Sequence, residues 1–310
     1  MGELLIDFTS CGKTADGNRL FAQNAGGAPA NVAVAVSRLS GKSAFIGKVG
    51  DDMHGRFLKE TLEENNVNCD GLILDGEHFT TLAFVDVGAD GEREFSFARK
   101  HGADKMLSED ELPLGLIKNS RIFHFGSVSL TDEPVKSATL CAAEYAKSQG
   151  VTVSYDPNYR ASLWESEAKA TEQMRHALKF ADLVKISEEE TLLLTGESDY
   201  TKAADKLVAD GVKIAVVTLG KDGAYLRTKD FGIKVDGFKV SAVDCTGAGD
   251  AFWGGFLTKL CESGKKCDEL TYDELYGFIR YANAVAGICV ERSGAIPSLP
   301  DKNEIETFLK

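Results

Sequence analysis

The chain alternates between short apolar runs and longer segments whose apolar residues recur with helical spacing. The apolar runs cover residues 4–8, 43–49, 121–125, 151–155, 183–186 and 214–218. The helical segments cover residues 31–39, 55–65, 133–149, 167–180, 188–195 and 201–209. This alternation is typical of βαβ units. We therefore expect an α/β fold with a mainly parallel sheet, helices on both faces and right-handed crossovers.

Two segments break the alternation. Residues 14–24 contain an Asp16-Gly17-Asn18 turn, and residues 79–99 hold two alternating strand patterns around residues 88–91. Because neither segment brings a helix, we expect hairpins at about 12–25 and 72–100 to form a small, inserted β-sheet. The sequence shows neither a Pro- or Ser-rich linker nor an internal repeat, so residues 1–310 are expected to form a single domain.

Charge and cysteine content narrow the range of functions. The formal net charge of −13 argues against nucleic acid or an anionic membrane as the main partner. The seven cysteines form no C-x-x-C pair, which favours reduced thiols over disulfides or a zinc site. No basic leader precedes residues 3–7, and no apolar stretch approaches the length of a membrane span. We expect a cytoplasmic protein.

The segment DCTGAGD at residues 244–250 precedes an apolar, helix-compatible run. The small residues Gly247, Ala248 and Gly249 let the backbone pass close to a ligand, and the first N–H groups of a helix attract phosphate. A carboxylate here would repel phosphate, so Asp250 makes sense as the base that takes a proton from an attacking hydroxyl. The pattern predicts a kinase in which the N–H groups at 247–249, and that of Asp250 itself, stabilise the transferring phosphoryl group.

Further motifs extend this interpretation to a family resemblance. AGGAPANVA at residues 25–33 is followed by Ser40-Gly41 and by GKVGDD at residues 47–52. With residues 244–250, these motifs resemble in order and spacing the signature regions of the ribokinase (PfkB) family of sugar kinases, over nearly the whole chain. The resemblance implies a ribokinase-like three-layer α/β/α domain, a lid that closes over the sugar, the use of ATP with Mg²⁺, and a homodimer formed through the lid. The family usually has Thr where this chain has Cys245, and we expect no loss of activity from that change.

The resemblance also assigns a sugar site. The positions that match sugar contacts of the family are Asp7, Gly26, Gly27, Asn31 and Asp250. Asp7 is expected to end the first strand, at the carboxyl edge where ligands bind to open α/β sheets. Arg99 and Arg160 are candidates for contacts with sugar hydroxyls, or alternatively for surface ion pairs.

A nucleotide site follows from the same resemblance. The positions concerned are Ser187, Thr218, Gly220, Gly223, Gly247, Gly249 and Asn283. The segment 218–223 resembles the T-x-G-x-x-G motif that approaches the ATP phosphates, although such a string is also a common hairpin. Ser187 replaces an Asn of the family, whereas Glu190 keeps the acidic position that acts on Mg²⁺ through water. Without the family context, the acidic run 188–190 would indicate a solvated helix start.

A monovalent cation site, for K⁺, is a further implication. Two segments would contribute to it, mostly through backbone carbonyls. The matching positions are Asp244 and Thr246 on one side and Cys289, Arg292, Gly294 and Ser298 on the other.

Residues 2–8, 97–104 and 186–190 look more like fructokinases than ribokinases or adenosine kinases. The predicted reaction is ATP + D-fructose → ADP + D-fructose 6-phosphate, with Asp250 taking the proton of the primary hydroxyl. One alternative is a 2-keto-3-deoxygluconate kinase, whose substrate carboxylate needs a cation that Arg99, Lys100, Arg160 or Lys105 could supply; another is a further sugar kinase of the family. A non-catalytic sugar-sensing relative is the alternative outside enzymes. A dehydrogenase is disfavoured, because the first strand is not followed by G-x-G-x-x-G.

Overall fold

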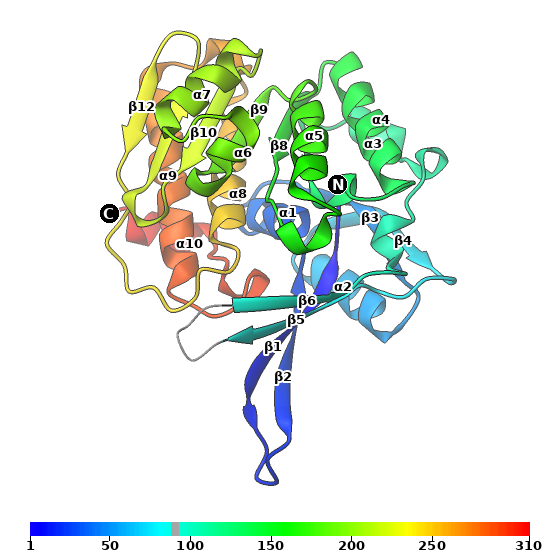
Figure 1. Ribbon diagram of the computed structural model, residues 1–310. Coiled ribbons are helices and arrows are strands. Elements are labelled where there is room, and N and C mark those ends of the chain that lie inside the picture. Colours follow the sequence, from blue (N-terminus) through cyan, green and yellow to red (C-terminus); the bar gives the residue numbers. More distant parts are fainter. Residues whose placement is uncertain (88–92) are drawn as a thin grey trace.

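The computed structural model describes residues 1–87 and 93–310, and its central element is a six-stranded sheet (Figure 1). The strand order is β12-β11-β10-β9-β8-β7. The bounds are β7 Ile122–Gly126, β8 Thr152–Asp156, β9 Leu183–Ser187, β10 Ile214–Thr218, β11 Ala224–Arg227 and β12 Gly232–Val235. Strands β7 to β10 pair in parallel, while β11 and β12 add an antiparallel edge. The expectation of a mainly parallel sheet is confirmed.

Helices cover both faces of this sheet, as the alternation of side chains along the strands shows. Val184 and Ile186 of β9 pack into one core with residues of α4, α5 and α7, whereas Leu183 packs into a second core with residues of α8 and α9. The bounds are α1 Ala28–Arg38, α4 Val135–Ser148, α5 Glu167–Leu178, α7 Tyr200–Ala209, α8 Ala248–Ser263 and α9 Tyr272–Val290. The strands are apolar on both sides because both sides are buried.

The small sheet has the order β2-β1-β5-β6, and its blue β1–β2 hairpin extends away from the rest of the molecule in Figure 1. Its strands are β1 Leu5–Lys13, β2 Arg19–Gly26, β5 Leu82–Val87 and β6 Arg93–Ala98. The predicted turn closes the first hairpin, with Gly17 at a φ of 83°. The predicted turn at residues 88–91 lies outside the described residues.

Three details of the sequence-based expectation are wrong. The first strand belongs to the small sheet and continues to Lys13, because residues 9–13 pair with β2. The predicted strand at residues 43–49 also lies outside the six-stranded sheet, since β3 (Ala44–Gly50) pairs with β4 (Asn68–Asp75). Residues 72–75 belong to β4, so the second hairpin of the small sheet begins at Leu82 rather than near residue 72.

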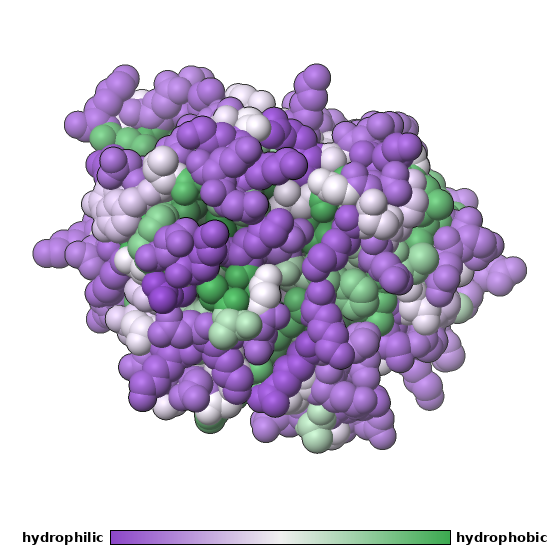
Figure 2. Space-filling view, turned by 90° about the horizontal axis from the view of Figure 1, so that it is seen from above, coloured by the Kyte–Doolittle hydropathy of each residue, from purple (hydrophilic) through white to green (hydrophobic). Residues whose placement is uncertain are grey.

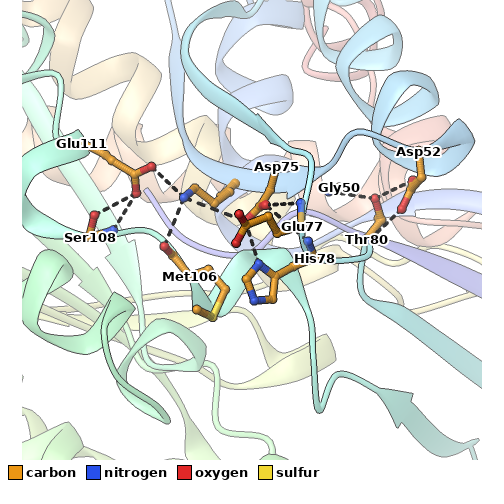
Figure 3. Close-up of polar contacts among 10 residues, drawn as sticks. Gly50, Asp52, Asp75, Glu77, His78, Thr80, Met106, Ser108 and Glu111 are labelled. Atoms are coloured by element: carbon orange, nitrogen blue, oxygen red, sulfur yellow. Dashed lines mark hydrogen bonds and ion pairs between the residues drawn. The ribbon is translucent and has the colours of Figure 1, made fainter.

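Buried polar contacts fasten β3 and β4 to the segments that follow them (Figure 3). Lys48 of β3 donates to Glu111 at 2.7 Å and to the carbonyl oxygen of Met106 at 3.2 Å. Asp52 caps α2 and also accepts hydrogen bonds from the backbone and the hydroxyl of Thr80, both at 2.8 Å. These groups satisfy one another, so the network serves the fold.

The remaining helices are peripheral. They are α2 Met53–Glu64, α3 Leu114–Lys118, α6 Thr191–Thr195 and α10 Lys302–Phe308. Short 3₁₀ turns lie at residues 103–105, 109–111, 128–130, 161–163, 188–190, 220–222, 267–269 and 296–298. From above, hydrophilic residues dominate the surface, and hydrophobic residues show mainly between them (Figure 2). Within the described ranges, no helix has the length and apolar character needed to cross a membrane.

Candidate active site

Two cavities meet at the N-terminus of α8. The small cavity has a volume of about 90 Å³ and includes Gly247 and Asp250 in its wall. The large cavity has a volume of about 690 Å³ and includes Ala248 and Gly249. The first turn of one helix therefore lies between two cavities, and the larger is within the usual size range of small-molecule sites.

Asp250 is held at this boundary by two amides. The side-chain nitrogen of Asn31 lies 2.8 Å from one carboxylate oxygen, and that of Asn158 lies 3.5 Å from the other. Burial raises the pKa of Asp250, while the charge of Lys185 and the Asn31 hydrogen bond oppose that rise. Helix α1 thus presents Asn31, and α8 presents the carboxylate that Asn31 orients.

The helix start that was predicted to bind an anion is formed at Gly247, with one difference from the expected geometry. Gly247 has a φ of 76°, a left-handed conformation that favours glycine, and it starts α8. The N–H groups of Gly249 and Asp250 have no partner within the described ranges, as expected for the first turn of a helix. The N–H group of Ala248, however, donates to the carbonyl oxygen of Cys245 at 3.2 Å, so this group holds the turn instead of facing a ligand.

Two glycines make room for the wall of the small cavity. A Cβ atom on Gly26 would lie 2.1 Å from Oδ2 of Asp7, and one on Gly27 would lie 2.4 Å from the carbonyl oxygen of Glu3. Gly27 also has a φ of 114°. Asp7 lines the cavity as expected, but it lies inside β1 and does not end that strand. Gly26 itself is not part of the cavity wall; it makes space for the Asp7 carboxylate.

Unpartnered polar atoms gather around the small cavity. In the described part of the chain, Glu3 Oε2, Asn31 Oδ1 and Thr246 Oγ1 are buried without a hydrogen-bond partner, and all three residues line this cavity. Burial raises the pKa of Glu3 to about 7. Buried polar atoms normally have partners, so these atoms suit a ligand with several hydroxyl groups. Sequence reasoning missed Glu3, although Glu3, Leu5 and Asp7 are spaced by two residues and all line this cavity.

The two predicted arginines have different positions. Arg160 lines the small cavity, and its guanidinium donates to the carbonyl oxygen of Tyr159 at 3.1 Å. Arg99 does not line it: its guanidinium is buried and donates to Asp104 and Thr131, each at 2.7 Å, and to the carbonyl oxygen of Val128 at 3.1 Å. A buried guanidinium needs acceptors for its donors, and the protein supplies them, so the structure does not bring Arg99 to the sugar site.

The large cavity collects most of the predicted nucleotide residues, namely Thr218, Gly220, Gly223, Gly249 and Asn283. The side-chain amide of Asn283 donates to the carbonyl oxygens of Val235 and Asp236, each at 3.2 Å, and so fixes the chain that leaves β12. Gly247 lines the small cavity instead, and Ser187 lines neither cavity.

Glu190 lines neither cavity. Its two oxygens accept hydrogen bonds from the N–H groups of Tyr159 at 2.7 Å and Ser187 at 2.8 Å, and burial raises its pKa. No group of three His, Cys, Asp or Glu side chains among residues 1–87 and 93–310 is placed to hold a metal ion. The site therefore fits Mg²⁺ only as an ion that keeps its waters and binds the phosphates, which is the usual behaviour of Mg²⁺.

The two segments of the predicted monovalent cation site lie together. Asp244 accepts hydrogen bonds from the N–H groups of Thr246 at 2.7 Å and Gly294 at 3.0 Å. The sulfur of Cys289 lies 3.0 Å from the hydroxyl of Ser298. The Arg292 side chain points elsewhere and pairs with Glu304. At Arg292, therefore, only the backbone carbonyl is available to a cation, whereas Thr246 also has an unpartnered hydroxyl.

Comparison with known proteins agrees with this arrangement. The model of the pfkB family carbohydrate kinases matches residues 1–302. Fructokinase-2 of Zea mays is 45% identical over 304 residues, which cover 96% of this chain and 90% of the maize protein.

Two solved structures have the same fold. Fructokinase with bound ATP from Xylella fastidiosa has a TM-score of 0.92 at 34% identity and covers 99% of this chain and 96% of that one. Fructokinase from Vibrio cholerae O395, in a form with fructose, ADP and calcium ion bound, has a TM-score of 0.89 at 33% identity and covers 100% of this chain and 97% of that one. The chain belongs to the pfkB family of carbohydrate kinases.

Proposed function

We propose that the protein transfers the γ-phosphoryl group of ATP to the primary hydroxyl at C6 of D-fructose, which yields D-fructose 6-phosphate and ADP. The observation that carries this proposal is the Asp250 carboxylate at the boundary of the two cavities, beside unpartnered N–H groups of α8. The similarity to fructokinases of plants and bacteria supports fructose as the acceptor.

In this mechanism fructose occupies the small cavity and the nucleotide occupies the large one. Asp250 accepts the proton of the attacking hydroxyl, while Asn31 and Asn158 keep the carboxylate pointing at it. The N–H groups of Gly249 and Asp250 and the positive end of α8 stabilise charge on the transferring group. Mg²⁺ would be held by the phosphates and its own waters, and would supply neutralisation of phosphate charge.

The test compares ADP release with fructose, ribose, 2-keto-3-deoxygluconate and adenosine, for the wild type and for D250N. Loss of the base should lower kcat by roughly 10²–10⁴-fold and leave fructose and ATP binding nearly unchanged, because the amide keeps the size of the carboxylate. D110N, at an exposed carboxylate, is the matched control. Unchanged turnover in D250N would refute the assigned base, and lost binding would make the residue structural.

A 2-keto-3-deoxygluconate kinase is the second candidate, because Arg160 in the small cavity could pair with a substrate carboxylate. A higher kcat/KM for the keto acid than for fructose, abolished in R160Q, would favour it. Asp250 and the α8 turn would keep their roles in that case.

We propose further that the small sheet forms a homodimer interface, that K⁺ binds between residues 244–246 and 289–298, and that the protein is cytoplasmic. The first point is supported by Leu20, Phe21 and Phe84 on this sheet, which expose 42%, 37% and 39% of their surface. The cytoplasmic location is supported by cysteines that are all free thiols. Sedimentation velocity at micromolar concentration tests the homodimer, and a monomer would contradict the interface. A parallel activity assay with and without K⁺ tests the cation site.

A further inference from the structure

Strand β9 carries a buried cation that the mechanism above does not use. Lys185 exposes 5% of its surface, and its ammonium donates to Oδ2 of Asp156, at the end of β8, at 2.7 Å. Within the described part of the chain this is its one hydrogen-bond acceptor, whereas an ammonium has three donors. Two donors of a buried charge are thus left for a ligand or water.

The ammonium lies directly against the anion-binding turn. A Cβ atom on Gly249 would be 2.8 Å from Nζ of Lys185, so glycine is what lets the lysine approach α8 at this point. The N–H group of the same Gly249 has no partner in the described ranges. The spare donors of Lys185 and the free donors of α8 therefore lie in one small region.

The charges around Lys185 explain why a cation is needed there. Asp156, Glu190 and Asp250 surround it, and their attraction, opposed by burial, raises the pKa of Lys185 above its usual value. Three buried carboxylates would repel an incoming phosphoryl group. Lys185 stays protonated and offsets part of that repulsion.

We propose that Lys185 contacts the transferring phosphoryl group and donates a hydrogen bond to one of its equatorial oxygens, while Asp156 holds the ammonium in place. The proposal rests on the phosphoryl group binding at the N-terminus of α8. During transfer the bond from phosphorus to the ADP oxygen breaks, the bond to the sugar oxygen forms, and the hydroxyl proton moves to Asp250. Lys185 keeps its proton throughout.

The test uses the variant K185M, with K48M as the matched control. Lys48 is also buried in ion pairs but lies in the β3–β4 network. K185M should lower kcat by about 10²-fold or more, with the KM for fructose and the affinity for ADP within about threefold of wild type. It should also fail to form the complex of ADP, fructose and aluminium fluoride, which imitates the transferring group. K48M should lower stability and form that complex normally.

Removal of Lys185 leaves Asp156 buried and unpaired, so the double variant D156N/K185M is measured as well. This variant should recover stability but neither turnover nor aluminium fluoride binding. The acid limb of the kcat/KM profile should also move to higher pH in K185M, because Lys185 lowers the pKa of Asp250. Aluminium fluoride binding as tight as in K48M, or turnover restored in the double variant, would overturn the proposal. Both measurements are separate from the kinetics of D250N, which test only the role of Asp250 as the base.

Discussion

Substitution of Gly254 by alanine adds a single carbon atom to the contact between α1 and α8. A Cβ atom there would lie 2.5 Å from Cβ of Ala35 on α1 and 3.3 Å from the carbonyl oxygen of Val32. Ordinary contact begins at 3.4 Å, so the G254A variant must separate the two helices by about 1 Å. These helices carry Asn31 and Asp250, whose 2.8 Å hydrogen bond crosses the same interface.

Two opposing effects determine how much G254A changes the free energy of unfolding. Alanine is favoured over glycine inside a helix by about 1 kcal/mol, whereas overpacking of a close contact costs about 1–3 kcal/mol. Gly277, exposed in α9, isolates the first term, because a Cβ atom added there would meet no atom within 4 Å. We expect G277A to raise the free energy of unfolding by up to about 1 kcal/mol and G254A to lower it by up to about 2 kcal/mol.

Urea unfolding of the two variants measures the stability change, and steady-state kinetics measures its effect on the site. Displacement of Asn31 from Asp250 should lower kcat in G254A by up to about 10²-fold, while G277A keeps wild-type kcat. The pair A35G/G254A removes the clashing methyl group, and its coupling energy should be at least about 1 kcal/mol in favour of the pair. G254A as stable and active as G277A, or the absence of coupling with Ala35, would refute the packing argument.

Two further predictions concern the walls of the cavities. Burial raises the pKa of Glu3 from an ordinary value of 4.5 to about 7, so folding favours its protonated form. The resulting contribution of Glu3 to the free energy of unfolding is fully present below pH 4.5 and is lost as pH rises through 7. Between pH 5 and pH 8 the free energy of unfolding of the E3Q variant should therefore change by up to about 3 kcal/mol less than that of the wild type. Urea unfolding without ligands measures this change, and a pH dependence equal to that of the wild type would contradict the prediction. C245T should keep kcat within about twofold, because the backbone oxygen of Cys245, and not its thiol, binds the Ala248 N–H group; a loss of more than about tenfold in a kinase assay would show that the thiol matters.

The proposed reacting centre follows from the sequence because its chemistry depends on local order along the chain. Gly247, Gly249 and Asp250 lie within one helical turn, so the backbone geometry of a helix start determines where their groups point. Gly27 and Asn31 likewise lie on the first turn of α1. The family resemblance and the α/β fold, both confirmed, come from the same short-range patterns.

The small sheet was harder to predict because strand pairing is a long-range property. Residues 4–8 have the apolar pattern of a buried parallel strand, yet β1 pairs with β2 and β5 in the small sheet. Nothing in a single strand tells which sheet it joins, since side-chain alternation is the same in both. Arg99 shows a similar limit: its partner Asp104 follows five residues later, but only the folded chain shows that Thr131 and Val128 accept its remaining hydrogen bonds.

Glu3 and Lys185 show what an isolated charge in an apolar segment can mean. Each lies among apolar neighbours, Glu3 beside Leu4 and Lys185 between Val184 and Ile186, and each is more than nine-tenths buried. Burial of a charge is unfavourable unless partners or ligands compensate for it, so such residues are more informative than the charged runs on the surface. Glu3 keeps an unpartnered oxygen at the small cavity, and Lys185 keeps spare donors beside Gly249, so each brings unused hydrogen-bonding capacity to the candidate site.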